Sequence, residues 1–198
     1  MSKKILIVGS QGYLGSRLMS YLSNQGNECK GIDTGFFKNG VLTHIVSEDV
    51  EKKDARLIVQ NDLEGYDVLI LLAGISNDPF GHMSSAQIYD PTRVYALSIA
   101  SMCKQLKIQF IYPSSCSVYG AAKDEFLSED STTNPQTPYS INKLQVENGL
   151  SELAGKNFSP IALRFGTVYG LSSRIRFDVV INMLCGLALT SKKNNSKL

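Results

Sequence analysis

The feature that most constrains this fold is an alternation of short apolar runs with longer amphipathic stretches. Runs rich in Val, Ile and Leu predict buried strands at residues 5–8, 28–33, 42–46, 68–72, 108–112 and 158–165. Helical spacing of apolar residues, with cap and Pro signals, predicts helices at residues 14–26, 91–106, 137–154 and 177–189. Strands and helices in this rhythm predict an α/β fold, a doubly wound parallel sheet with helices on both faces.

Composition narrows the class of protein. Of the 198 residues, 43% are hydrophobic and 19% charged, so the chain can bury a core without disulfides. The net charge of +2 arises from lysines in residues 192–198, and we expect no nucleic-acid partner. The cysteines lack metal-site spacing, so no metal is expected. With neither a signal-peptide nor a membrane-spanning run, we expect a cytoplasmic protein without a membrane partner.

A glycine triplet, Gly9, Gly12 and Gly15, lies between the first strand and the first helix. Such a turn bends tightly, lets backbone approach a pyrophosphate, and packs the helix closely on the strand. The helix N-terminus then offers N–H groups to the phosphates. The alternative is a glycine-rich loop without a ligand, but the position directly after an N-terminal strand favours dinucleotide binding.

Asp33 ends the second predicted strand, 18 residues after Gly15. A carboxylate there accepts hydrogen bonds from an adenine-ribose 2′-OH and repels a 2′-phosphate. No Arg follows in residues 34–37, so the sequence favours NAD over NADP. The alternative is an Asp that caps a strand–turn junction.

Tyr139 and Lys143 lie four residues apart in the helix that opens at Thr137, so they share a helix face. A nearby cation favours the phenolate, and we expect it to lower the Tyr139 pKa and to make Tyr139 a general acid/base. A Ser-rich run at 113–120 follows the fifth strand, where hydroxyls face the ligand crevice. The alternatives are a surface Tyr–Lys pair and a Ser-rich turn that caps backbone groups.

Four motifs in chain order carry a family resemblance: the glycine turn, SSCSVYG at 114–120, PYSINK at 138–143 and LRFGTVYG at 163–170. Together they resemble the extended short-chain dehydrogenase/reductase family, and more narrowly an NAD-dependent epimerase/dehydratase of the sugar-nucleotide type. The resemblance runs from Lys4 to about Gly186. It implies a Rossmann fold, NAD as cofactor, a nucleotide-sugar substrate, and a homodimer formed through the helices near 91–106 and 137–154. The apolar stripe of Tyr95, Ile99, Met102 and Leu106 permits this dimer, and the alternative is that the stripe packs into the core of the same chain.

The resemblance also implies residue roles. Tyr139 would take a proton from a sugar hydroxyl as hydride passes to NAD⁺, while Ser115 hydrogen-bonds the same oxygen and Lys143 binds the nicotinamide ribose. The implied cofactor contacts are Gly9, Gln11, Gly12, Tyr13, Leu14, Gly15, Asp33, Asp54, Ala55, Leu72, Ala73, Gly74, Tyr139, Lys143, Phe165 and Val168.

Some positions depart from the family pattern. Cys116 and Ser117 stand where dehydratases carry an acidic residue, which favours epimerisation or simple oxidation and reduction over dehydration. Thr92 and Thr167 replace asparagines common in the family, which leaves the substrate open. The basic run at 174–176, with Arg174 and Arg176, is expected either to meet phosphates or to lie in a solvated loop.

The chain is also shorter than family members. We therefore expect an NAD-binding domain at 1–170, the start of a truncated substrate-binding region at 171–190, and a polar tail at 191–198. The predicted function is an NAD-dependent sugar-nucleotide epimerase. The alternatives are an NAD-binding remnant without activity and a dehydratase or reductase of the same family. An NAD-sensing regulator is disfavoured, because Tyr139 and Lys143 are both present.

Overall fold

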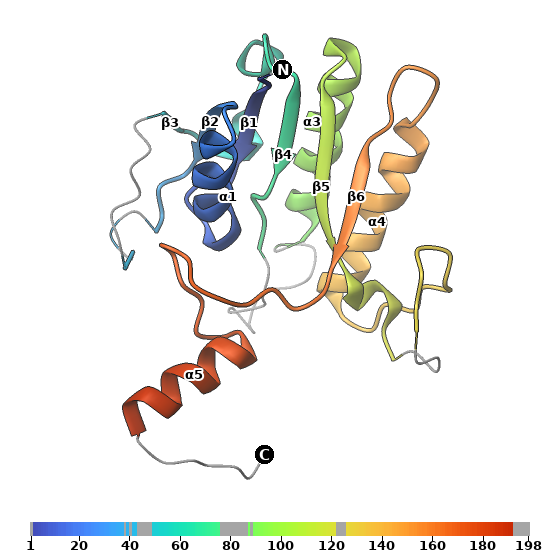
Figure 1. Cartoon of the computed structure of the whole chain (residues 1–198). Coiled ribbons are helices and arrows are strands. Elements are labelled where there is room, and N and C mark those ends of the chain that lie inside the picture. The colour runs from blue at the N-terminus through green and yellow to red at the C-terminus, as the bar shows by residue number, and fades with distance from the viewer. Residues whose placement is uncertain are drawn as a thin grey trace.

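The computed structural model describes residues 2–37, 39, 41–42, 49–75, 87, 89–121 and 126–191. Its centre is a six-stranded sheet in the order β3-β2-β1-β4-β5-β6, in which every neighbouring pair is parallel (Figure 1). The strands are β1 Lys4–Val8, β2 Glu28–Asp33, β3 Val50–Lys52, β4 Val68–Leu71, β5 Gln109–Ser115 and β6 Ile161–Phe165. The order reverses between β1 and β4, which is the Rossmann arrangement and confirms the predicted fold class.

Helices cover both faces of the sheet. The α-helices are α1 Tyr13–Asn24, α3 Asp90–Leu106, α4 Pro138–Leu153 and α5 Val180–Ser191, and short 3₁₀ turns are η1 Ala55–Leu57, η2 Gln60–Leu63 and η3 Cys116–Tyr119. Figure 1 shows α1 on one face and α3 with α4 on the other, while α5 lies away from the sheet. None of the helices in the described ranges is long and apolar enough to cross a membrane.

The two faces of β1 explain its unbroken apolar sequence. Ile5 and Ile7 pack with Met19 of α1, whereas Leu6 and Val8 belong to the larger core formed with α3 and α4. A central parallel strand covered on both faces needs apolar residues at successive positions, not alternating ones. The apolar stripe of α3 that includes Ile99 likewise packs into this core.

Two predicted elements differ from the structure. The strand expected at 42–46 falls largely on residues 43–48, which lie outside the described residues, and the third strand of the sheet is Val50–Lys52 instead. The sequence did not predict this strand, because it is three residues long and carries one apolar side chain. The helix expected from residue 91 begins at Asp90, so that Tyr89 and not Asp90 occupies the N-cap position.

Candidate active site

The glycine turn lies at the edge of the sheet where the parallel strands end, which we call the carboxyl edge. Gly9 has φ +90°, and a Cβ there would lie 2.5 Å from the backbone N of Ala73. A Cβ on Gly15 would lie 2.1 Å from the carbonyl oxygen of Gly9. Gly12, in contrast, has only that carbonyl near its Cβ direction, at 3.4 Å. The packing of the chain itself therefore requires glycine at 9 and 15, while the side of Gly12 stays open.

Asp33 joins the glycine turn to the end of β2. Its Oδ2 accepts a hydrogen bond from the Gln11 N–H and its Oδ1 from the Gly35 N–H, both at 2.9 Å. The capping role that the sequence offered as an alternative is thus confirmed. Each carboxylate oxygen has two lone pairs, so Asp33 keeps acceptor capacity for a ribose hydroxyl.

Asp54 and Ala55 follow the carboxyl end of β3. The Asp54 carboxylate accepts from the Arg56 N–H and pairs with the Arg56 guanidinium, with Nη2 to Oδ2 at 2.6 Å. This side-chain hydrogen bond from Arg56 holds the pKa of Asp54 below its usual range. The arrangement caps η1 and holds Ala55 in a buried position.

The segment after β4 lies against the glycine turn. The N–H groups of Leu72 and Ala73 both donate to the Val8 carbonyl, at 2.7 and 2.8 Å. The Tyr95 hydroxyl of α3 donates to the Ala73 carbonyl at 3.0 Å. Leu72, Ala73 and Gly74 are therefore fixed at the point where the strand order reverses, which is where such sheets bind ligands.

Ser115, Tyr139 and Lys143 come together at the end of β5. Ser115 is the last residue of β5, and its side chain is close enough to Tyr139 to act on the pKa of the phenol. Tyr139 lies in the first turn of α4, whose N-terminus is capped by Thr137. The Lys143 ammonium donates to the Pro113 carbonyl at 2.6 Å and lies 5.5 Å from the centre of the Tyr139 ring.

The pKa of Tyr139 corrects an expectation from the sequence. Burial raises this pKa above its usual value, while the Ser115 hydrogen bond and the charge of Arg176 act to lower it. Burial also lowers the pKa of Lys143 to about 8, opposed by Glu147. The sequence predicted a lowered Tyr139 pKa because the spacing shows the neighbouring Lys143. It does not show that burial removes water from around Tyr139 and Lys143.

Ser117 orients the Ser115 hydroxyl. Its own hydroxyl donates to the Ser115 Oγ at 2.9 Å, and its backbone N–H does so at 3.2 Å. Because both groups donate into this oxygen, the Ser115 hydrogen is left to point to Tyr139. From the sequence, Ser117 is named only within the Ser-rich run and at a position where dehydratases carry an acidic residue.

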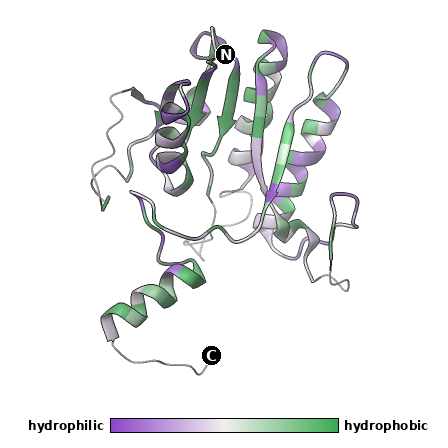
Figure 2. Cartoon of the chain, viewed as in Figure 1, coloured by the Kyte–Doolittle hydropathy of each residue, from purple (hydrophilic) through white to green (hydrophobic). Residues whose placement is uncertain are grey.

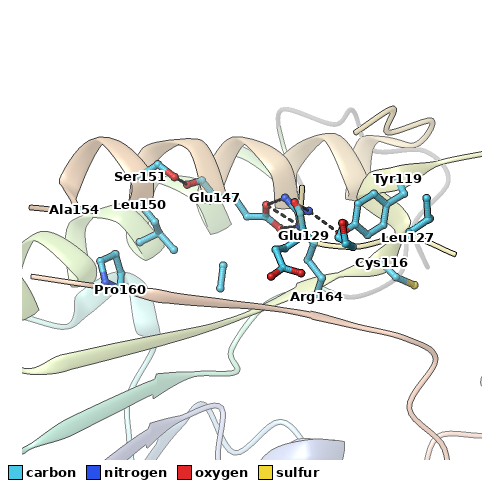
Figure 3. Close-up of a pocket in the computed structure, with 12 residues that line it drawn as sticks. Cys116, Tyr119, Leu127, Glu129, Glu147, Leu150, Ser151, Ala154, Pro160 and Arg164 are labelled. Atoms are coloured by element: carbon cyan, nitrogen blue, oxygen red, sulfur yellow. Dashed lines mark hydrogen bonds and ion pairs between the residues drawn. The ribbon is translucent and has the colours of Figure 1, made fainter. Parts of the chain in front are cut away.

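The sequence did not predict a buried ion pair that Glu147 forms one helical turn after Lys143. Glu147, only 8% exposed, pairs with Arg164 of β6 at 2.7 Å (Figure 3). It also accepts a hydrogen bond from Ser114. It joins α4 to both β5 and β6. A cavity of about 590 Å³ lies beside the pair, and Ser115, Tyr139 and Lys143 do not line it. The available signal was the position of Glu147, four residues after Lys143.

The residues expected after β6 are only partly brought into the site. Phe165 pairs with Ser115 in the β5–β6 register, while Val168 is exposed in the segment that follows. Arg174 stacks on the ring of Phe37 at 4.2 Å, and Arg176 pairs with Asp178 at 2.6 Å. Neither arginine thus lies in a freely solvated loop.

Comparison with known proteins identifies the family. Residues 5–192 match the family model described as the NAD dependent epimerase/dehydratase family. The chain belongs to this family. It is 31% identical over 204 residues to a protein of Bacillus subtilis (strain 168) named "Uncharacterized UDP-glucose epimerase YtcB", covering 96% of this chain and 63% of that protein. It is 26% identical over 178 residues to the UDP-glucose 4-epimerase of Lactobacillus helveticus, covering 86% and 53%.

Solved structures of epimerase/dehydratase family enzymes share the fold. The UDP-glucuronic acid 4-epimerase from Bacillus cereus in complex with NAD superposes with a TM-score of 0.77 at 26% identity, over 94% of this chain and 63% of that one. The NDP-hexosamine 5,6-dehydratase TunA superposes with a TM-score of 0.82 at 23% identity, over 96% and 62%. The chain therefore spans between half and two thirds of the length of these relatives.

Proposed function

We propose that this chain holds NAD at the carboxyl edge, with the glycine turn on the pyrophosphate. The open side of Gly12 fits this role, because a pyrophosphate needs close access to backbone N–H groups and the chain's own packing does not occupy that side. Asp33 would hold the adenosine ribose, and Asp54 with Ala55 the adenine. Leu72, Ala73 and Gly74 would lie under the cofactor. Crystal complexes of relatives with NAD support the proposal.

NAD supplies hydride acceptance and return when bound. Tyr139 would take a proton from a substrate hydroxyl at its phenolate oxygen, and Ser115 would donate a hydrogen bond to that same hydroxyl oxygen. The charge of Arg176 favours the Tyr139 phenolate against the effect of burial, and the Lys143 ammonium lies 5.5 Å from the centre of the Tyr139 ring. Ser117 would keep the Ser115 hydrogen directed towards the reacting oxygen.

The proposed reaction is epimerisation of a nucleotide sugar. The observation that carries it is the convergence of Ser115, Tyr139 and Lys143 at the carboxyl end of β5 in an epimerase/dehydratase family chain. Relatives named as UDP-glucose epimerases support the substrate class. Cys116 and Ser117 supply no strong acid to a leaving hydroxyl, which disfavours dehydration.

We further propose a domain boundary near residue 170, with the NAD-binding domain before it and substrate-binding structure after it. The relatives' additional length would supply the rest of that structure. The homodimer expected through α3 and α4 also stays a proposal. Val94 of α3 and Ile141 of α4 are exposed apolar residues on the two helices that would form it.

Two measurements test the proposed function. Titration calorimetry with NAD⁺ measures cofactor binding, and incubation with UDP-, GDP- and dTDP-sugars measures epimerised product. We expect binding and turnover with a member of the panel, and loss of turnover in Tyr139→Phe. Tyr21→Phe, an exposed tyrosine on α1, is the matched control. Binding without turnover of any sugar would favour the inactive NAD-binding alternative, and Tyr139→Phe with wild-type turnover would contradict the mechanism.

A further inference from the structure

The segment 166–178, which we call the strap, leaves β6 and crosses the carboxyl edge to α1 (Figure 1). Most of its residues are at least partly exposed, and the clear exception is Ser172, which is 4% exposed. Apolar burial therefore contributes little to holding the strap in place. Its contacts with the rest of the molecule are predominantly polar and specific.

Asn182, in the first turn of α5, is the centre of these contacts and is 6% exposed. Its Oδ1 accepts from the Gly170 N–H at 2.9 Å, and its Nδ2 donates to the Tyr13 hydroxyl at 3.1 Å and to the Arg176 carbonyl at 2.9 Å. The amide thus uses both of its N–H donors and one acceptor position. One side chain joins both ends of the strap to α1.

Tyr13 and Ser172 complete the network. The Tyr13 hydroxyl donates to the Gly170 carbonyl at 2.8 Å, so both backbone polar groups of Gly170 are bound. Gly170 has φ +116°, a conformation that favours glycine. The Ser172 hydroxyl donates to the Tyr13 carbonyl at 2.7 Å, so the hydrogen in its 2.9 Å contact with Ser16 comes from Ser16.

The strap carries Arg176, and the charge of this side chain reaches Tyr139. The charge of this arginine acts on the phenols of Tyr139 and Tyr13, and Asp178 holds its guanidinium through Nε and Nη2 at 3.0 and 2.6 Å. The carbonyl of Arg176 itself is a partner of Asn182. The position of Arg176 thus depends directly on the amide.

We propose that Asn182 is a positioning residue: its amide holds the strap against α1, and the strap in turn holds Arg176 beside Tyr139. The effect of Arg176 on the reaction rests on the proposed function. The holding of the strap against α1 by Asn182 does not require NAD. The role of Asn182 is therefore tested on the 198-residue chain without NAD.

Limited trypsin digestion measures how readily the strap opens, because trypsin cleaves after Arg174 and Arg176 within it. Cleavage of a locally opened segment follows the opening equilibrium. We expect Asn182→Ala to speed cleavage at these two bonds by roughly five- to thirtyfold, as for the loss of more than one net hydrogen bond. Ser191→Ala, on the same helix, removes a hydroxyl that donates to the Leu187 carbonyl within α5, and this variant should be cleaved like wild type.

Tyr13→Phe is a second, milder variant of the same network, for the case that Asn182→Ala unfolds as a whole. It removes one hydroxyl and should accelerate strap cleavage by a smaller factor. Unfolding would instead expose sites inside α3, such as Lys104, at the same rate as Arg174 and Arg176. The proposal is overturned if the strap is cleaved at the wild-type rate both in Tyr13→Phe and in a folded Asn182→Ala. If Asn182→Ala does not fold, the cleavage rate of Tyr13→Phe alone decides the proposal.

A second readout responds to the position of Arg176. The chain has no Trp, so tyrosinate absorbance is free of Trp overlap, and subtracting the titration of Tyr139→Phe isolates Tyr139. Tyr139 is also faced by Ser115, Tyr89, Cys116 and Lys143, which the strap does not carry. We expect Asn182→Ala, and not Ser191→Ala, to titrate Tyr139 at higher pH. If Asn182→Ala speeds strap cleavage but Tyr139 titrates at the wild-type pH, the proposed link between the strap and Tyr139 is refuted. If the chain only fails to bind NAD, the proposed function is contradicted and the role of Asn182 is not.

Discussion

At the residue scale, the three glycines of the turn are predicted to behave differently. A methyl group on Gly15 would meet the Gly9 carbonyl at 2.1 Å and the Ser10 Cα at 2.7 Å, so the backbone must shift. We expect Gly15→Ala to lower the unfolding free energy by about 1–3 kcal/mol or more, as overpacking does. Urea denaturation measures this change.

Gly12→Ala is the matched variant, because Gly12 has φ −77° and ψ −177°, which alanine adopts, and open space beside it. We expect its unfolding free energy to stay within about 1 kcal/mol of wild type. Its NAD affinity should fall at least tenfold, because the methyl group would enter the space proposed for the pyrophosphate. Wild-type NAD affinity in a folded Gly12→Ala would contradict the proposed position of the cofactor.

Lys143 gives a prediction for the pH dependence of stability. Burial lowers the pKa of Lys143 from its ordinary value of 10.5 to about 8 in the folded chain. Between pH 8 and 10.5, therefore, Lys143 holds a proton in the unfolded chain but not in the folded chain. The unfolding free energy contributed by this residue therefore rises with pH across that window. Urea unfolding at several pH values should show this rise in wild type but not in Lys143→Met, and equal slopes in both would contradict it.

At the element scale, the sequence predicted the sheet well because each central strand carries its own signal. Residues 28–33 match β2 to the residue, and the Thr137 cap with Pro138 placed the start of α4. The bonds that tie elements together had no such signal. Glu147 meets Arg164 and Ser114 only after three separate elements have folded, and Asn182 meets Tyr13 across 169 residues.

The Glu147–Arg164 pair predicts how α4 and β6 depend on each other. Glu147→Gln leaves a mostly covered guanidinium without its counter-charge, and we expect it to lower the unfolding free energy by about 2–4 kcal/mol. Arg164→Met strands the carboxylate and should have a similar effect. The double variant Glu147→Met/Arg164→Met should lose less than the sum of the two single variants, because no charge is left unpaired. Additive losses in urea denaturation would argue that the two side chains act independently.

At the scale of the whole molecule, apolar surface gathers at β6 and α5. β6 is the last strand in the sheet order, and Ile161, Leu163 and Phe165 on it are exposed. Figure 2 shows α5 hydrophobic along much of its length although it lies apart from the sheet. Its exposed apolar residues are Val180, Ile181, Met183, Leu184, Leu187 and Leu189. Contiguous apolar surface and an unpaired strand edge are both features that proteins ordinarily cover.

We therefore predict that the 198-residue chain binds a hydrophobic dye and self-associates as its concentration rises. Replacing Leu187 and Leu189 together by Lys should reduce both effects, because charges on α5 oppose burial of its apolar surface. Leu57→Lys is the control, since Leu57 is exposed on η1, far along the chain from α5. Dye fluorescence and sedimentation velocity measure the two effects. Equal reduction in both variants would show that added charge alone, and not the surface of α5, controls association.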